Sequence, residues 1–581
     1  MARVVVIDDR DPIAELLVKR LQESPRVEAC QRAPQSEDGF GGLLSGSYAG
    51  LLRDQRADTV VYSPPLLPRA LVPDLTDAET VFQHCSRAGI RQFILLSSAA
   101  IYAPGPNHPG HVSEARLLSR QEKSAPANHW ADLESLAVLY FGDRSETRLA
   151  ILRPAAMPFP GGADYFSRLF NSRVAVVFPG HDPSLQVLSP EDLASAVARV
   201  VERGAEGVYN VAADGVITLR AALRLAGAKR LPISRVAQRM ARAALTPLGL
   251  ARPIDQLEYI RYSWTVSNRK IKRELEWTPR RSSVEALRDF LVAEKGYVKS
   301  HEMPSLEFDD YGMDKNYIAA FGRHLFKFLH DRYWRVEVKG LNYLPRAGRA
   351  VLVGVHRGFM PWDAVMALHL IARNLGRYPR FLIHPGLIKF PFLFNFHTKL
   401  GGIIACQENA DYVLGRDEML AIYPEGIRGA FALYRDAYRL GKFGRDEYVK
   451  MALRNRAPII PFVTVGSAEI FPILGKLNWS WWKRHTEWPF FPLTPTWPLV
   501  PVPLPSKWHT QFLPPIHIEN RYPPEAADDA ATVRAISREV RSRLEETIAE
   551  MRASRKSIFF GSIFGEKPGY EEQMSYKERM S

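Results

Sequence analysis

A histidine and an aspartate, His356 and Asp363, are the residues of this 581-residue chain whose types and spacing best suit chemistry. A neutral imidazole can remove a proton from a hydroxyl. A carboxylate bound to its other nitrogen fixes the tautomer and stabilises the imidazolium that forms. The alternative interpretation is a buried structural histidine beside an aspartate that caps a helix. On the pair alone, the two interpretations are evenly balanced, because short motifs often occur by chance.

The segment around this pair, AVLVGVHRGFMPWDAVMA at 350–367, predicts the elements that must hold it. The apolar run 351–355 indicates a buried strand, a Met-Pro turn follows, and the apolar run 364–370 indicates a helix. The end of a strand that leads into a helix is where α/β proteins hold reactive side chains against ligands. We therefore expect His356 at the end of the strand and Asp363 at or near the start of the helix.

Three further blocks share the second half of the chain. AIYPEGIRG at 421–429 contains a Pro-Glu-Gly turn followed by Arg428, whose planar fork of donors suits phosphate or carboxylate. KLGGIIACQENA lies before it at 399–410, and APIIPFVTVG at 457–466 indicates an apolar strand bounded by prolines. The four blocks, in this order, resemble the glycerolipid acyltransferase family over residues 315–550, in particular its mono- and diacylglycerol acyltransferase-like branch.

The resemblance implies an α/β acyltransferase domain in which His356 is the general base and Asp363 orients it. The activated acceptor hydroxyl would attack the thioester of acyl-CoA or of an acyl carrier protein, with no acyl-enzyme, no required cofactor and no metal. The acceptor would be a glycerolipid or a lysophospholipid. The implied substrate-binding residues are Arg357, Gly401, Gly402, Ile403, Glu425, Gly426 and Arg428.

The match departs from the family pattern at two places. The usual spacing is His-x4-Asp, whereas six residues separate His356 from Asp363, as related branches with a proline in a longer turn tolerate. Gln407 stands where the family often carries a phosphate-binding arginine. The loss of that charge favours a neutral or differently charged acceptor, so lysophosphatidate, another lysolipid, and mono- or diacylglycerol all stay open.

The first half of the chain alternates predicted strands and helices, which predicts a parallel doubly wound sheet. Strands are expected at 2–7, 58–62 and 92–97, and helices at 12–22, 77–88, 128–141 and 190–203. The expected fold class is therefore α/β with two domains.

Segments of this half resemble extended short-chain dehydrogenases and NAD-dependent epimerases over residues 1–297. They are FILLSSAAIY at 93–102, LAILRPA at 149–155 and GVYNVAA at 207–213. The resemblance implies a Rossmann-like domain.

Two departures predict that this domain is degenerate. The first turn, DDRDP at 8–12, has three acids and no glycine, so it would repel a pyrophosphate. Trp130 and Glu134 stand where the family has a Tyr-x3-Lys pair, and neither side chain can take over those roles. We expect redox catalysis to be lost and NAD(P) binding to be doubtful, although a cofactor bound in a modified way stays open. The alternatives are an NAD(P)-dependent oxidoreductase or epimerase with an appended lipid-binding domain, and a catalytically silent lipid-binding scaffold.

The net charge and the cysteines limit which partners and which cellular compartment are compatible with this sequence. A net charge of +14 fits nucleic acid or an anionic lipid surface. Lipid is favoured because zinc-finger spacing, RNP-type aromatic motifs and concentrated Lys/Arg tracts are absent from the sequence. Cys30, Cys85 and Cys406 are too far apart for a metal or disulfide framework, which fits a reducing compartment. With no signal peptide and no apolar run of spanning length, we expect a cytoplasmic protein bound peripherally to the inner face of the membrane.

Composition also sets the expected boundaries. Polar residues 298–314 predict a linker, 315–555 the acyltransferase domain, and 556–581 a polar tail. The segment 315–334 predicts an amphipathic helix that docks on the domain or lies on a membrane. Tryptophans interleaved with lysine and arginine over 470–508 are typical of a membrane–water interface or of an acyl tunnel.

Overall fold

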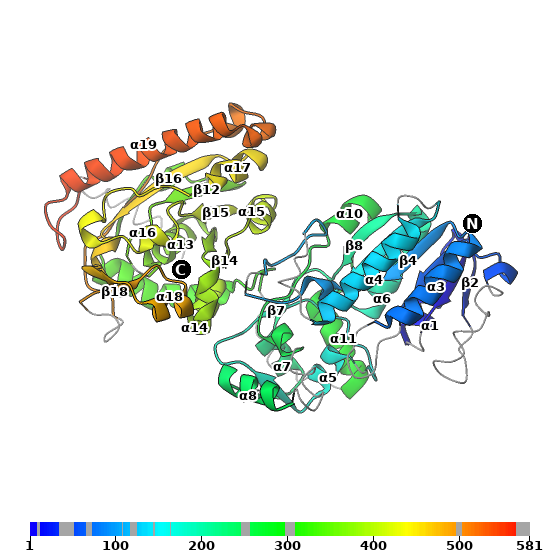
Figure 1. Ribbon diagram of the computed structural model, residues 1–581. Helices are drawn as coiled ribbons and strands as arrows, with labels where there is room; N and C mark the ends of the chain where they lie inside the picture. Colours follow the sequence, from blue (N-terminus) through cyan, green and yellow to red (C-terminus); the bar gives the residue numbers. More distant parts are fainter. Residues whose placement is uncertain are drawn as a thin grey trace, which may run out of the picture. The chain divides into compact units, whose positions relative to one another are not determined.

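The chain divides into two compact units, residues 1–313 with 391–395 and residues 314–390 with 396–581 (Figure 1). The predicted linker lies outside the described residues up to 307, and the predicted tail lies outside them from 565. The computed structural model describes residues 1–8, 12–33, 52–64, 73–106, 108–116, 125–142, 146–162, 164–245, 256–296, 308–358, 360–444, 446–495 and 502–564.

The first unit is built on a six-stranded sheet in the order β2-β1-β3-β4-β5-β8, with every pair parallel. Its strands are β1 (Ala2–Ile7), β2 (Val27–Arg32), β3 (Thr59–Tyr62), β4 (Gln92–Leu96), β5 (Arg148–Pro154) and β8 (Gly207–Val211). All residues of β3 and β4 are buried, as expected for central strands covered on both faces. The predicted doubly wound, Rossmann-like sheet is confirmed.

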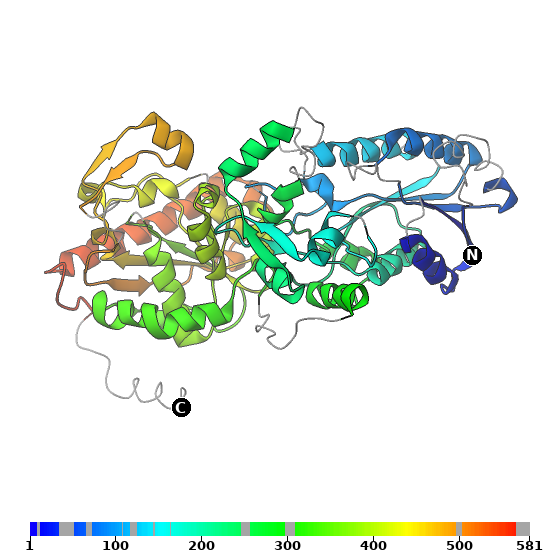
Figure 2. The same cartoon turned by 90° about the horizontal axis from the view of Figure 1, so that it is seen from below.

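Four helices cover the two faces of this sheet (Figure 2). They are α1 (Pro12–Gln22), α3 (Leu75–Ala88), α4 (Ala125–Phe141) and α6 (Pro190–Arg203). Side chains of α1 and α6 share one apolar core, and side chains of α3 and α4 share the other. Local signals fix the ends of α3, because the Asp74 side chain accepts from two backbone N–H groups and Gly89 ends the helix in the left-handed conformation.

Smaller elements complete the first unit. Two-stranded sheets pair β6 with β10 and β7 with β9, and residues of α5 and η4 line a pocket at the carboxyl ends of β4 and β5. The bounds are α5 (Tyr165–Asn171), β6 (Val174–Val177), β7 (Ser184–Leu185), β9 (Ile217–Thr218), α7 (Leu219–Leu225), β10 (Lys229–Pro232), α8 (Arg235–Leu245), η4 (Gln256–Ile260), α10 (Arg269–Leu275) and α11 (Ser283–Lys295).

The second unit holds a seven-stranded sheet in the order β11-β19-β16-β12-β15-β13-β14. Its strands are β11 (Glu337–Lys339), β12 (Ala350–Gly354), β13 (Arg380–Ile383), β14 (Gly402–Ile404), β15 (Met419–Ile422), β16 (Ile459–Val465) and β19 (His509–Phe512). β12 is the middle strand, parallel to both β15 and β16, and β19 runs antiparallel to β16. The predicted α/β class is confirmed in this half as well.

The helices of the second unit include α13 (Trp362–Leu375), which follows β12, and α19 (Ala530–Ser554), which packs on β16. The others are α12 (Lys315–Phe321), α15 (Gln407–Leu414), α16 (Ile427–Ala430), α17 (Glu447–Arg454) and α18 (Ser480–Thr486), and a hairpin is formed by β17 (Gly475–Leu477) and β18 (Phe491–Leu493). The first five residues of α14 (Pro391–Lys399) are assigned to the first unit and the rest of it to the second. In the described part of the chain, no helix has the length and hydropathy needed to cross a bilayer.

The expected amphipathic helix over 315–334 is not one regular α-helix. After α12 it continues through two π-helical segments, η5 (Gly322–Phe326) and η6 (Leu329–Tyr333). Each π turn adds residues to the helical repeat and shifts the phase of the face that follows. Phe326 and Leu329 are therefore buried, whereas Phe328 is exposed.

Candidate active site

His356 lies two residues beyond the middle strand of the second sheet. β12 ends at Gly354, where a Cβ atom would lie 2.4 Å from the ring of Phe462, so only glycine fits there. Asp363 is the second residue of α13. The Nδ1 atom of His356 lies 2.7 Å from Oδ2 of Asp363. The structure therefore brings together the two residues that the sequence analysis paired.

Three hydrogen bonds hold the Asp363 carboxylate, which is almost fully buried. Besides the imidazole, its Oδ2 accepts from the backbone N–H of Arg357 at 3.1 Å, and its Oδ1 accepts from the backbone N–H of Ala364 at 2.8 Å. The first turn of a helix also favours a negative charge. The longer spacing is absorbed by a turn in which Gly358 has a positive φ of 85° and lies against the Ser467 carbonyl.

This geometry determines which nitrogen of His356 can act. Because Asp363 accepts from Nδ1–H, the neutral imidazole carries its lone pair on Nε2. The His356 side chain is 13% exposed, and in the described part of the chain its Nε2 has no hydrogen-bond partner. The pair can therefore accept a proton from a hydroxyl that approaches Nε2.

Tyr423, the residue after β15, packs against the histidine. Its ring centroid lies 5.3 Å from that of His356, and its buried hydroxyl has no hydrogen-bond partner among the described residues. Burial raises the pKa of Tyr423 well above its usual value, and the negative charge of Asp363 raises it further. The phenol therefore stays neutral. The sequence analysis gave Tyr423 no role, although its position at the carboxyl end of a buried strand was a usable signal.

Arg357 and Glu425 form a buried ion pair rather than an open anion site. The Nη1 and Nη2 atoms of Arg357 lie 2.6 and 3.0 Å from the Glu425 carboxylate oxygens. The remaining N–H groups donate to the backbone carbonyl oxygens of His356, Ala437 and Arg439. All five N–H groups of Arg357 are thus used within the protein, which differs from the expected contact with an anionic substrate. Arg357 and Glu425 instead fix the loops around His356.

The Pro-Glu-Gly turn separates a buried carboxylate from an exposed cation. Gly426 has φ 56° and ψ −147°, a conformation essentially restricted to glycine. Arg428 follows on α16, exposed and without an ion-pair partner in the described ranges. A Cβ atom on Gly429 would lie 3.2 Å from the His356 carbonyl oxygen, so α16 packs directly beside the histidine. Of the two arginines predicted to bind an anion, Arg428 is the one with free donors.

The Gly-Ile block lies further from the histidine than expected. Gly402 and Ile403 belong to β14, the edge strand, with Gly401 directly before it. β13 and β15 separate β14 from β12, which is roughly 14 Å at the usual strand spacing. These three residues share the sheet with His356 but are not its immediate neighbours. Gln407 begins α15, and its side chain donates to Asp411.

A second buried cluster supports the loop after β16. The Glu469 carboxylate accepts from Arg555 at 2.6 Å and from the Tyr438 hydroxyl at 2.5 Å. Burial, and then the charge of Glu469, raises the pKa of Tyr438 well above its usual value. The cluster joins the end of α19 to the loop that contacts Gly358 through Ser467. The sequence analysis missed it, because its members are far apart in the chain.

In the first unit, Glu134 of α4 is locked in a buried network. Arg153 donates to both of its carboxylate oxygens, at 2.9 and 2.5 Å, and the Ser97 hydroxyl donates at 2.6 Å. Arg153 also donates to the Tyr102 hydroxyl at 2.7 Å. An ion pair thus stands where the dehydrogenase-like family needs a lysine, and Trp130 stands one turn earlier.

The end of β1 does not suit a dinucleotide either. Asp8 accepts two hydrogen bonds from Arg32, at 2.8 and 2.6 Å, so a carboxylate and its partner occupy the approach to α1. The other acids of the predicted turn, Asp9 and Asp11, lie outside the described residues. Among the described residues, neither the positions of Trp130 and Glu134 nor the end of β1 offers the groups that redox NAD(P) chemistry uses in that family. The described ranges also contain no group of three His, Cys, Asp or Glu side chains that could hold a metal.

Comparisons with known proteins divide along the same two halves. An acyltransferase family model matches residues 335–465. The uncharacterized protein Rv0502 of Mycobacterium tuberculosis is 34% identical over 294 residues, which cover 48% of this chain and 80% of that protein. The uncharacterized protein ML2427 of Mycobacterium leprae is 33% identical over 285 residues, 47% of this chain and 76% of that protein. Phytyl ester synthase 2 of Arabidopsis thaliana is 30% identical over 146 residues, 24% of this chain and 20% of that protein.

Solved structures of NAD-dependent epimerases are also similar to this chain. The UDP-glucose 4-epimerase of Thermus thermophilus in complex with NAD is 18% identical, with a TM-score of 0.37, and the match covers 50% of this chain and 98% of that one. The UDP-N-acetylglucosamine 4-epimerase of Bacillus cereus is 12% identical, with a TM-score of 0.38, and the match covers 51% of this chain and 100% of that one.

Proposed function

We propose that this chain, which belongs to the family of these mycobacterial relatives and carries an acyltransferase domain at residues 335–465, moves a fatty acyl group from acyl-CoA or an acyl carrier protein to a hydroxyl of a glycerolipid or lysophospholipid. The observation that carries the proposal is the 2.7 Å contact between His356 Nδ1 and Asp363 Oδ2, which leaves Nε2 free within the matched range.

The mechanism needs one base and no covalent enzyme intermediate. The Nε2 atom of His356 takes the proton of the acceptor hydroxyl as that oxygen attacks the thioester carbonyl carbon. The carbon–sulfur bond then breaks, and the imidazolium returns the proton to the leaving thiolate. The products are an ester and a free thiol, and Asp363 stabilises the imidazolium between the two proton transfers.

Some of the residues near His356 would position the loop that begins at it, and others would bind the substrate. Arg357 and Glu425 are positioning residues, since their buried ion pair fixes the loop that begins at His356. Arg428 is the candidate contact for an anionic group on the acceptor or the donor. Gln407 brings no charge to the position where the family often has an arginine, so neutral alcohols belong among the acceptors. The name of one relative, phytyl ester synthase, also denotes an ester of a neutral alcohol.

We propose that the hairpin β17–β18, together with α18, contacts the cytoplasmic face of an anionic membrane (Figure 2). Its exposed apolar side chains are Leu474, Leu477, Trp479, Trp481 and Leu493. The exposed cations Lys476 and Arg484 lie among them. Amphipathic indoles beside cations suit the headgroup region of an anionic bilayer. The double substitution Trp479→Ala, Trp481→Ala is expected to reduce co-flotation with phosphatidylglycerol vesicles; unchanged flotation would contradict this assignment.

An acceptor screen with radiolabelled acyl-CoA tests the proposed reaction. The full chain is incubated with lysophosphatidate, another lysolipid, monoacylglycerol, diacylglycerol and a long-chain alcohol, and labelled esters are measured. His356→Ala is expected to lower the rate about 10²- to 10⁴-fold, the usual contribution of a general base. His324→Ala is a matched control, because His324 is exposed on η5. If His356→Ala transfers acyl groups as fast as the wild type, the mechanism is wrong.

A further inference from the structure

A cavity of about 240 Å³ lies at the carboxyl edge of the sheet in the first unit. Its floor includes Ser63 after β3, Ser97 after β4 and Ala155 after β5. It is larger than the roughly 150 Å³ apolar cavity that admits a benzene ring. The carboxyl edge of a doubly wound sheet is where this fold binds ligands. The question is therefore which chemistry the walls of this cavity select.

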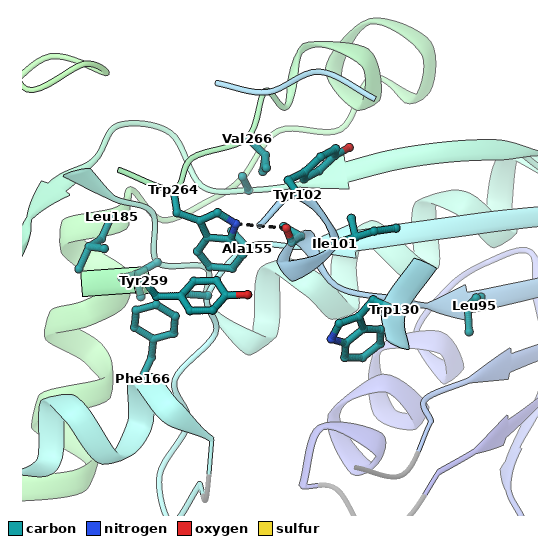
Figure 3. Close-up of a cluster of buried hydrophobic side chains, with 14 of the residues drawn as sticks. Leu95, Ile101, Tyr102, Trp130, Ala155, Phe166, Leu185, Tyr259, Trp264 and Val266 are labelled. Atoms are coloured by element: carbon teal, nitrogen blue, oxygen red, sulfur yellow. Dashed lines mark hydrogen bonds between the residues drawn. The ribbon is translucent and has the colours of Figure 1, made fainter. Parts of the chain in front are cut away.

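Aromatic rings form most of the walls. Phe166 and Trp264 stack with centroids 6.0 Å apart, and Tyr259 meets Trp264 edge to face at 4.9 Å. Trp130 faces this group from α4, and the Tyr259 hydroxyl points toward it (Figure 3). The residue that replaces the catalytic tyrosine of the dehydrogenase-like family thus adds apolar surface to the cavity. Such walls favour an apolar ligand.

The described residues of the lining offer no cation to an anionic ligand. None of the described residues that line it is lysine, arginine or histidine. The one carboxylate in the lining, Asp164, is used to cap α5, where it accepts from the backbone N–H groups of Phe166 and Ser167 at 2.9 and 3.0 Å. Arg153, whose strand leads to the cavity, is paired with Glu134. A phosphate or a fatty-acid carboxylate would find no cation among the described residues of the lining.

The lining residue Tyr165 carries a buried polar group without a partner. The Tyr165 hydroxyl is buried and has no hydrogen-bond partner among the described residues. An unsatisfied buried donor is unfavourable unless a bound molecule accepts its hydrogen bond. The ligand that suits the cavity therefore has one oxygen acceptor on an apolar body.

We propose that this cavity binds an uncharged lipid, an apolar chain or ring that carries a single hydroxyl or ester oxygen, in place of a dinucleotide. The aromatic walls would hold the apolar body, and the Tyr165 hydroxyl would donate to the oxygen. The site belongs to the first unit alone and does not depend on the acyl transfer proposed for the second. A free alcohol and its ester share this chemistry, so both are tested.

Equilibrium binding of tritiated 1-hexadecanol to the delipidated full chain tests the proposal. Competition uses unlabelled hexadecyl acetate, palmitate and NADH. The expected result is saturable binding that the ester displaces and that neither palmitate nor NADH displaces. Because the second unit can also bind an acceptor alcohol, Ala155→Phe is used to fill this cavity, and it should remove one equivalent of bound hexadecanol. His356→Ala should retain that equivalent.

Tyr165→Phe gives the sharper readout, since it removes one oxygen atom. It should weaken hexadecanol binding about two- to tenfold, the range expected for one hydrogen bond, and leave hexadecane binding unchanged. Tyr140→Phe is the matched control, because its hydroxyl lies at the surface of α4.

Two results would overturn the proposal. One is displacement of hexadecanol by NADH. The other is unchanged binding in Tyr165→Phe together with unchanged binding in a folded cavity-filling variant. If Ala155→Phe does not fold, as judged by circular dichroism, Ala100→Phe fills the cavity from its partly exposed rim instead. Failure of acyl transfer would leave these measurements unaffected, so the two proposals fail separately.

Discussion

Each unit of this chain holds a buried carboxylate beside the carboxyl ends of parallel strands, and the two carboxylates have different partners. In the second unit, Asp363 binds His356, whose other nitrogen is free at a partly exposed position. In the first unit, Glu134 binds Arg153 through both oxygens and also accepts from Ser97. The two units therefore present one open and one closed site.

The difference follows from the chemistry of the two cations. Imidazole gains and loses a proton near neutral pH, whereas guanidinium keeps its proton and has no acceptor atom. The His356–Asp363 pair can therefore move a proton, and the Arg153–Glu134 pair can only hold the structure together. The chemistry that each site allows is thus set by the side chains at the ends of the strands, in accord with the general separation of fold and function.

Asp363→Asn is expected to have the largest effect on acyl transfer. An amide can donate to Nδ1 and leave the proton on Nε2, which removes the base while the geometry is kept. We expect kcat to fall about 10²- to 10⁴-fold. Glu134→Gln is the matched control in the first unit and should leave kcat unchanged. A fall of less than tenfold in Asp363→Asn would break the contrast between the two carboxylates.

Arg357→Ala and Arg153→Ala test whether both ion pairs are structural. Each substitution leaves a buried glutamate without its cation, which should lower the free energy of unfolding by about 3–5 kcal/mol. Only Arg357→Ala should also lower acyl transfer, because it loosens the loop that begins at His356. Urea unfolding of the full chain measures the change in stability, and the assay with radiolabelled acyl-CoA measures the change in acyl transfer. A double variant, Arg357→Met with Glu425→Leu, should recover much of the lost stability, because it removes both charges. If Arg357→Ala alone lowers the free energy of unfolding by less than about 1 kcal/mol, the ion pair has no structural role.

The two units should also differ in their response to acid. Burial, with His330 and Arg373 nearby, lowers the pKa of His369 in the second unit to about 4, and burial lowers that of His509 to about 4. In the first unit, burial lowers the pKa of His108 to about 3. Unfolded histidine binds its proton near pH 6.5, so below that pH the unfolded state binds more protons and the folded state loses stability.

The loss should run from pH 6.5 to about 4 for His369 and His509 and to about 3 for His108, at up to about 1.4 kcal/mol per pH unit for each histidine. His369→Leu should flatten the profile of the second unit between pH 6.5 and 4, as followed by denaturant unfolding at several pH values. His324→Leu, at an exposed position, should leave it unchanged. An identical profile in His369→Leu would mean that this histidine is not buried as a neutral group.

The sequence was sufficient for features set by local pattern. The apolar run before His356 predicts β12, and the proline and aspartate after it predict the start of α13. Strand–helix alternation likewise predicts the sheet of the first unit.

Features set by distant partners could not be predicted in this way. Arg357 was expected to bind an anion because the sequence does not show that Glu425, 68 residues later, lies opposite it. Glu469 and Arg555 are 86 residues apart and meet only through the packing of α19. The phase of the helix after Lys315 changes at π turns that carry no sequence signal of their own.

The smallest expected effects come from two tyrosines whose hydroxyl groups are used differently. The Tyr423 hydroxyl is buried without a partner in the described ranges, so Tyr423→Phe should leave the stability unchanged or raise it by up to about 1 kcal/mol. The Tyr102 hydroxyl accepts from Arg153 and donates to Asn210 at 2.8 Å, so Tyr102→Phe should cost about 1–3 kcal/mol. Urea unfolding of both variants measures this difference. If Tyr423→Phe is the more damaging of the two, its hydroxyl has a partner in solution, and the open site is more tightly organised than its hydrogen bonds indicate.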